Sequence, residues 1–294
     1  MLTHQLPAAR SLRNEVHPKE WEARVQLAAC YRVFAFLGWT EMIYNHITLR
    51  LPQEVCGSEK QFLINPFGLH YSEVTASNLV KIDLKGKALD GSPYPVNPAG
   101  FTVHAALHDN LPEAHCVMHT HTTAGVSVAC MKEGLQQTNF YTAQLHNMIA
   151  YHDFEGITIH SDEAPRLLSS IGNKQAVILR NHGLLAWGAT LPQTFAILWT
   201  LQRACEIQLA TFSMGGPSQV IPVSEDVAAK CTRDALQFNP NHGAGNDVLD
   251  ALIRQVDRQL HKPEESYRLS KFVFTAQAPL AVGSACTWRE RGMR

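Results

Sequence analysis

Two histidines one residue apart, His119 and His121, stand in the stretch VMHTHTTAG. If HCVMHTH (115–121) is a β-strand, side chains two residues apart lie on one face, so the two imidazoles are separated by about 7 Å along the backbone. Imidazole nitrogens bind zinc and similar cations. Alone, the pair is weak evidence for a metal, because polar histidines at the end of a strand are the commoner case.

A third histidine, His182, follows an apolar run in QAVILRNHGLLAWG (175–188). We expect it at the tip of a buried strand, where Gly183 allows a tight turn of the backbone. By itself it reads as a turn histidine bonded to the backbone. Together with His119 and His121 it completes a set of three neutral imidazoles. Such a set leaves one coordination position open, which predicts a catalytic rather than a structural divalent-metal site.

A rival pair, His104 and His108, has the i, i+4 spacing that places two side chains on one face of a helix. This spacing can also bind zinc, but the pair lacks the glutamate of a metalloprotease helix. We therefore rank this pair below the strand site as a candidate metal site. One of the two histidines of the pair can still face the strand site.

The elements that must position these residues alternate between helices and short strands. A proline at residue 18 and a glycine at residue 38 predict a first helix over 18–38. The other predicted elements are strands in 42–52, 59–70, 115–121, 153–162 and 175–188, a strand and hairpin in 81–95, and helices over 75–80, 97–114, 121–134, 192–216, 224–238 and 246–262. This alternation indicates a layered α/β architecture.

The chain has 294 residues, and we divide it into an N-terminal arm (1–17), one domain (18–262) and a C-terminal arm (263–294). Its net charge of -1 gives no electrostatic footprint for nucleic acid or an anionic membrane. No stretch is long and apolar enough for a membrane span. The seven cysteines form no C-x-x-C pair, which is typical of a reduced, cytoplasmic protein. The expected partner is a small molecule.

Five motifs, found between about Glu20 and Gly216, resemble those of the class II aldolase and adducin head domain family, on its adducin-like bacterial side. They are YNHITLR, INPFG, VNPAGFTVHAALH, VMHTHTTAG and LRNHGLLAWG, in the order of that family. The resemblance implies a three-layer α/β/α fold with a mostly antiparallel central sheet and a homotetramer with active sites at subunit interfaces. It also implies that His119, His121 and His182 bind a divalent cation, commonly Zn²⁺, which stabilises an enediolate in lyase-type chemistry.

The residues at two places depart from the aldolase pattern. Gly100 stands where the aldolases have the glutamate that transfers the proton, so we propose His104, one helical turn further on, as its replacement. The phosphate loops have lost hydroxyls and have no basic residue. Asn45, Asn65, Gly68 and Asn97 remain as candidate substrate-binding residues.

These departures leave two functions open. The first is a metal-dependent lyase-type enzyme (aldolase, dehydratase or decarboxylase) acting on a small hydroxy-carbonyl or sugar-phosphate-like substrate. The alternative is a catalytically silent, adducin-like oligomeric scaffold or binding protein.

Overall fold

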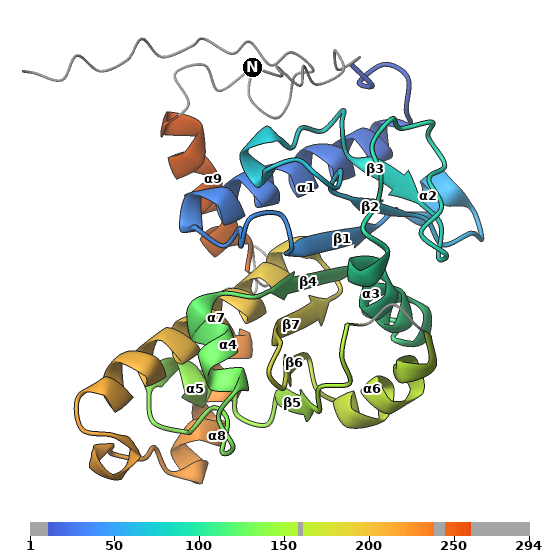
Figure 1. Ribbon diagram of the computed structural model, residues 1–294. Coiled ribbons are helices and arrows are strands. Elements are labelled where there is room, and N and C mark those ends of the chain that lie inside the picture. The colour runs from blue at the N-terminus through green and yellow to red at the C-terminus, as the bar shows by residue number, and fades with distance from the viewer. Residues whose placement is uncertain (1–10, 158–160, 238–244, 260–294) are drawn as a thin grey trace, which may run out of the picture.

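The computed structural model describes residues 11–157, 161–237 and 245–259, and over these ranges a mixed sheet of seven strands forms the centre of the protein (Figure 1). The strand order is β3-β2-β1-β4-β7-β6-β5. The strands are β1 (His46–Arg50), β2 (Phe62–Ile64), β3 (Val80–Ile82), β4 (Cys116–Thr120), β5 (Ile149–His152), β6 (Ala176–Leu179) and β7 (Gly183–Gly188). Strands β5 and β6 pair in parallel, and every other pairing within the described ranges is antiparallel.

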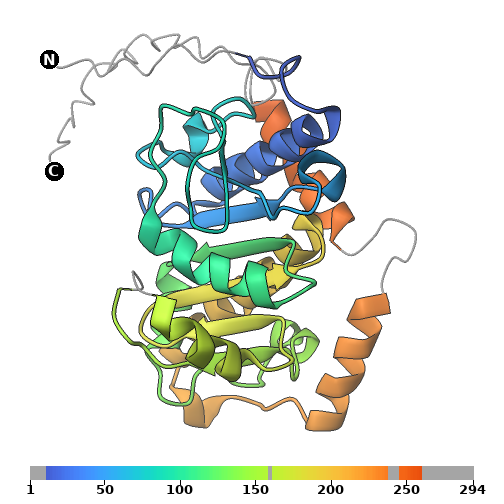
Figure 2. The same ribbon diagram turned by 90° about the vertical axis from the view of Figure 1, so that its right-hand side faces the viewer.

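Helices cover both faces of this sheet (Figure 1). One face packs against α1 (Pro18–Leu37), α4 (Thr123–Ala129), α7 (Leu191–Ser213) and α9 (Asn246–Gln259). The other packs against α3 (Pro98–Asn110) and α6 (Ala164–Ile171), which lie toward the viewer in Figure 2. The predicted three-layer α/β/α fold with a mostly antiparallel sheet is therefore confirmed.

The remaining described helices are short or lie beside these layers. They are α2 (Gln53–Cys56), α5 (Phe140–Gln144) and α8 (Glu225–Gln237), with 3-10 turns at Tyr71–Glu73, Ser161–Glu163 and Pro217–Gln219. No helix in the described part of the chain has the length and apolar character needed to cross a membrane.

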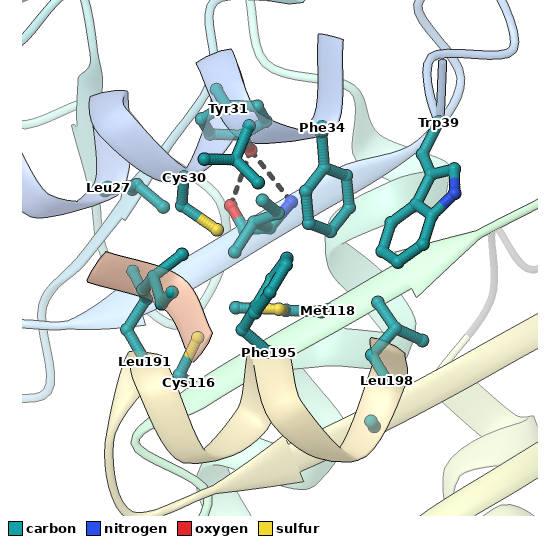
Figure 3. Close-up of a cluster of buried hydrophobic side chains, with 14 of the residues drawn as sticks. Leu27, Cys30, Tyr31, Phe34, Trp39, Cys116, Met118, Leu191, Phe195 and Leu198 are labelled. Atoms are coloured by element: carbon teal, nitrogen blue, oxygen red, sulfur yellow. Dashed lines mark hydrogen bonds between the residues drawn. The ribbon is translucent and has the colours of Figure 1, made fainter. Parts of the chain in front are cut away.

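Alternation along β4 decides which side chains enter which layer. Cys116 and Met118 belong to the core under α1 and α7, whereas Val117 belongs to the core under α3 and α6. Because side chains alternate along a strand, His119 lies on the α3 side. In the first core, Phe34 of α1 meets Phe195 of α7 with ring centroids 6.2 Å apart (Figure 3). Tyr31 of the same helix donates a hydrogen bond to the backbone oxygen of Ile47 in β1 at 2.7 Å, which fixes α1 to the sheet.

Helix α1 begins and ends as its sequence predicts. Pro18 is its first residue, and the side chain of His17 accepts a hydrogen bond from the backbone N–H of Lys19. At the other end Gly38 has a φ of 75°, in the left-handed region, and its N–H bonds to the carbonyl of Ala35.

Two predicted elements are wrong, and a third, the strand over 175–188, is a hairpin of two strands, β6 and β7. Residues 75–80 form a turn instead of a helix, because Thr75 and Asn78 bond reciprocally through side chain and backbone. The strand predicted over 153–162 lies earlier, at Ile149–His152, where the backbone pairs with β6; residues 153–157 form a loop, and 158–160 lie outside the described residues.

The domain boundaries stay predictions. The described part of the N-terminal arm, from residue 11, makes a contact with the domain: the Leu12 N–H donates to Ser77 Oγ at 3.3 Å. The C-terminal arm (263–294) lies outside the described residues.

Candidate metal centre and its pocket

His119, His121 and His182 come together where β4 ends beside the β6–β7 hairpin. One donor nitrogen from each lies within 4.8 Å of the other two. The Nε2 atoms of His119 and His182 are 3.3 Å apart. We call these residues the metal-site histidines, because three convergent imidazole nitrogens are a donor set suited to zinc and related cations.

His119 is held in a defined tautomer by the neighbouring strand. Its Nδ1 lies 2.8 Å from the backbone oxygen of Leu184, which can only accept, so Nδ1 carries the hydrogen. Nε2 therefore keeps its lone pair and faces His182. A backbone carbonyl that fixes the ring of a ligand in this way is characteristic of histidines that bind metals.

His121 is positioned through its backbone by Asn45. The His121 N–H donates to Asn45 Oδ1 at 2.8 Å, and the Asn45 amide donates in turn to the backbone oxygen of Trp39 at 3.0 Å. Trp39, just after α1, and Asn45, just before β1, thus fix the position of His121, which directly follows β4. Asn45 is 1 % exposed, and its amide oxygen and nitrogen both form hydrogen bonds inside the protein.

His182 occupies the turn of the β6–β7 hairpin rather than the tip of a single strand. The left-handed residue of this turn is Asn181, with a φ of 56°. The sequence predicted that Gly183 allows a tight turn of the backbone, but its role in the structure is different. A Cβ at this position would lie 2.3 Å from the backbone oxygen of Thr120 and 3.0 Å from His121 Cδ2, so glycine allows the hairpin to approach the end of β4.

Burial keeps the metal-site histidines neutral. It lowers the pKa of His121 to about 3, and the pKa of His119 falls well below its usual range for the same reason, with further lowering by the neighbouring imidazoles. The pKa of His182 is also lowered by burial. A neutral imidazole offers the lone pair that a cation requires. The burial, the convergence and the tautomer of His119 all fit a divalent cation.

The metal-site histidines form part of the wall of a pocket of about 450 Å³, which we call the site pocket. Its other described lining residues are Tyr44, His46, Phe67, Asn97, Gly100, Val103, Phe154, Gly156, Ile157 and Asn181. None of these described lining residues is a lysine, arginine, aspartate or glutamate. A larger cavity of about 1050 Å³ lies elsewhere and includes His115, at the opposite end of β4 from His119.

His46 occupies the space beside Gly100. It lies directly opposite His119 in the β1–β4 pairing, and the two ring centroids are 5.2 Å apart. A Cβ on Gly100 would meet Cε1, Nδ1 and Nε2 of the His46 ring at 2.9–3.1 Å. Burial lowers the pKa of His46 to about 4. His46 was not among the predicted site residues; the signal available was its place in the predicted strand 42–52, directly after the candidate residue Asn45.

His104, the predicted replacement for the glutamate, is fully buried behind His46 and is not among the lining residues. The centroids of the two rings are 4.2 Å apart. The rival pair, His104 and His108, shares the hydroxyl of Thr48, with each nitrogen 2.7 Å from Oγ1. This geometry separates His104 from the pocket by one side chain, and its role stays a prediction.

The backbone carbonyl of Ala114 fixes which atoms donate and which accept in the hydrogen bonds that link His108, Thr48 and His104. His108 Nδ1 lies 2.6 Å from the backbone oxygen of Ala114 and must donate to it. In the neutral ring, Nε2 then accepts from the Thr48 hydroxyl, whose oxygen accepts from His104 Nδ1. His104 Nε2 keeps its lone pair on the other side of the ring, where no described residue forms a hydrogen bond with it. The pKa of His104 is lowered well below its usual range by burial, with a smaller effect of His46 and His108, which keeps this arrangement neutral.

The four predicted substrate-binding residues separate into two groups. Asn97, the residue before α3, lines the site pocket. Asn45, Asn65 and Gly68 do not line it. Asn65 is buried, and its Oδ1 accepts a hydrogen bond from Tyr31 at 2.9 Å.

Comparison with known families identifies the family to which this architecture corresponds. Residues 25–209, more than half of the chain, match the family model for the class II aldolase and adducin N-terminal domain. The chain belongs to this family. The family contains both enzymes and adducins, and its aldolases generally depend on a divalent metal, so membership is consistent with the cluster of three histidines.

Among relatives in this class II aldolase and adducin family, a putative aldolase class 2 protein of Pseudomonas aeruginosa is 41 % identical over 261 residues, which cover 87 % of this chain and 96 % of the relative. Alpha-adducin of Rattus norvegicus is 38 % identical over 256 residues. These residues cover 83 % of this chain but 34 % of the adducin. The similarity therefore extends to both branches.

Solved structures agree with the family assignment. An aldolase II superfamily protein from Pseudomonas syringae has a TM-score of 0.79 and 37 % identity, covering 88 % of this chain and 100 % of its own. An L-fuculose 1-phosphate aldolase from Glaciozyma antarctica PI12 has a TM-score of 0.71 and 26 % identity, covering 90 % and 97 %.

Proposed function

We propose that this class II aldolase-like protein is a metal-dependent lyase-type enzyme that acts on a small hydroxy-carbonyl substrate. The observation that carries the proposal is the convergence of three neutral imidazoles, one buried and two half-buried, on the wall of a pocket. His119, His121 and His182 would hold the cation, with Zn²⁺ the expected metal. Three protein ligands leave a position for substrate, as in catalytic zinc sites.

The cation, when bound, supplies Lewis-acid stabilisation of the negative charge that develops on a substrate oxygen. Retro-aldol cleavage, dehydration and decarboxylation of a hydroxy-carbonyl compound all develop such a charge. The proposal therefore covers this group of reactions.

The remaining residues orient the substrate. His46 is the imidazole of the pocket wall beside His119, and Gly100 leaves the space that it fills. We assign His46 to substrate contact. His104, whose tautomer is fixed through Thr48, supports His46 from behind as a positioning residue. Asn97 and Asn181 provide neutral amides at the pocket wall.

We further propose that the protein works in the cytoplasm as a homotetramer, as the family resemblance implies.

The proposal is tested by loading the purified full chain with Zn²⁺ or Mn²⁺ and incubating it with a panel of hydroxy-aldehydes, hydroxy-ketones and 2-hydroxy acids. Mass spectrometry would detect cleavage, loss of water or loss of carbon dioxide. We expect turnover that requires metal and disappears in His119→Ala. Equal turnover after removal of the metal by a chelator would contradict the proposal.

The alternative, a catalytically silent scaffold, is favoured by the similarity to alpha-adducin. In that case the metal would serve assembly. Sedimentation of a His119→Ala/His121→Ala variant separates the two functions. A scaffold would dissociate without its metal and show no turnover with it, whereas an enzyme would lose turnover and keep its assembly.

A further inference from the structure

We propose that the site pocket selects a carboxylate substrate with an apolar substituent and without a phosphate group, a substrate class that rests on the metal-dependent function proposed above. The pocket is neutral at its described lining residues, and much of its wall away from the histidines is apolar. The substrate class follows from which apolar and charged groups of a ligand these lining residues can bind.

The residues that would meet the far end of a ligand are aromatic or aliphatic. They are Tyr44, Phe67, Val103, Phe154 and Ile157. The ring centroid of Phe154 is 6.0 Å from that of His182, so an aromatic face begins next to the metal-site histidines.

Three of these side chains are unusually exposed for their size. Phe154 is 52 % exposed, Tyr44 is 58 % exposed and Ile157 is 80 % exposed. Apolar side chains gathered at the mouth of a pocket mark a surface that becomes covered by a ligand or a protein partner. Because they line the pocket itself, the occupant we infer is the apolar part of the substrate.

A phosphate ester finds no matching side chain here. It carries a charge of about -1.5 to -2 at neutral pH, and proteins usually pair it with arginine or lysine. The described lining residues include neither, and they include no serine or threonine whose hydroxyl could replace them. The candidate anion ligands Asn45 and Asn65 use their side chains for internal hydrogen bonds.

The negative charge of a single carboxylate, in contrast, can be balanced at this site. The lining residues Asn97 and Gly100 lie at the amino-terminal end of α3, where the helix dipole contributes roughly half a positive charge. The bound cation would supply the remaining positive charge. The combination fits a 2-hydroxy or 2-oxo acid whose side chain is apolar.

Two matched pairs of probes test the inference on the zinc-loaded full chain by isothermal titration calorimetry. Lactate and 3-phenyllactate differ by a phenyl group. Glycerate and 3-phosphoglycerate differ by a phosphate, and both keep the 2-hydroxy acid group. We expect 3-phenyllactate to bind at least fivefold more tightly than lactate, and 3-phosphoglycerate to bind less than fivefold more tightly than glycerate. Either ratio on the other side of fivefold would overturn the inference.

A variant locates the phenyl site. Phe154→Ala should remove most of the advantage of 3-phenyllactate and leave the zinc content unchanged. The control is Phe140→Ala, which removes an exposed phenylalanine outside the pocket lining and should keep that advantage. If Phe154→Ala changes the oligomeric mass and not the ratio, the aromatic rim belongs to a subunit contact and the inference fails.

Failure of the proposed function gives a different result. A protein that binds no stoichiometric zinc, or that binds lactate equally with and without zinc, contradicts the metal-dependent site itself. Zinc-dependent lactate binding with no gain from the phenyl group contradicts the substrate class alone.

Discussion

The imidazole of His46 lies where a side chain at Gly100 would begin. The ring atoms Cε1, Nδ1 and Nε2 all fall 2.9–3.1 Å from the position of a Cβ on residue 100, which is closer than side-chain carbons normally approach other atoms. The two residues are therefore complementary: the ring requires glycine at position 100, and a larger residue there would require the ring to move.

The first prediction concerns this complementarity. Gly100→Ala should destabilise the protein by up to about 2 kcal/mol, since overpacking of a core costs about 1–3 kcal/mol and the higher helix propensity of alanine offsets about 1 kcal/mol of this cost. In a His46→Val background the same substitution should instead stabilise the protein by up to about 1 kcal/mol. Denaturant unfolding of the four proteins measures both values. An equal effect of Gly100→Ala in both backgrounds would show that the two positions do not interact.

The second prediction concerns the metal. His119→Ala, His121→Ala and His182→Ala should each abolish stoichiometric zinc binding after dialysis, measured by mass spectrometry of the metal. His115→Ala is the matched control, because His115 directly precedes β4 and lies at the end of that strand away from the site. It should bind zinc like the parent. Retention of stoichiometric zinc in His182→Ala would remove that residue from the ligand set.

The third prediction concerns Asn45, which holds the backbone of His121 and does not line the pocket. Asn45→Ala should weaken zinc binding by about 10–100-fold, the usual effect of losing a residue that orients a metal ligand. Asn65→Ala removes another buried asparagine, bonded to Tyr31, and should leave zinc affinity close to that of the parent. Competition with a chelating dye gives both affinities. Similar losses in the two variants would indicate a general effect of destabilisation.

The fourth prediction concerns acid stability. Burial lowers the pKa of His108 to about 3 from 6.5, so the unfolded chain takes up the proton first as the pH falls. The stability due to this neutral ring is complete above pH 6.5 and is lost as the pH falls toward 3. The loss is about 1.4 kcal/mol per pH unit.

His108→Gln tests this directly. In metal-free protein, the slope of the unfolding free energy against pH between about 4.5 and 6 should be smaller in the variant by about 1.4 kcal/mol per pH unit. Unfolding in denaturant at several pH values measures the slope. An unchanged slope would mean that His108 is protonated in the folded protein.

Local sequence patterns were sufficient for much of the fold. The first proline and terminal glycine of α1, and the alternation of β4, depend on neighbouring residues and were predicted at the right places. The pattern failed where a local side-chain bond outweighed helix propensity, as at Thr75 and Asn78, and where one apolar run held two strands of a hairpin.

The sequence by itself determined which donors are present: two histidines at the end of an apolar strand, a third before Gly183, and no carboxylate at position 100. Only the tertiary structure decided which residues surround these three histidines. The antiparallel register of β1 and β4 places His46 opposite His119, and Asn45 reaches the backbone of His121 across 76 residues of sequence. Register is set by the burial of alternate side chains over the whole sheet, so no single stretch contains it. For that reason, the family resemblance and the spacing from Gly100 indicated His104 as the replacement for the glutamate, whereas the sheet placed His46 between His104 and the pocket.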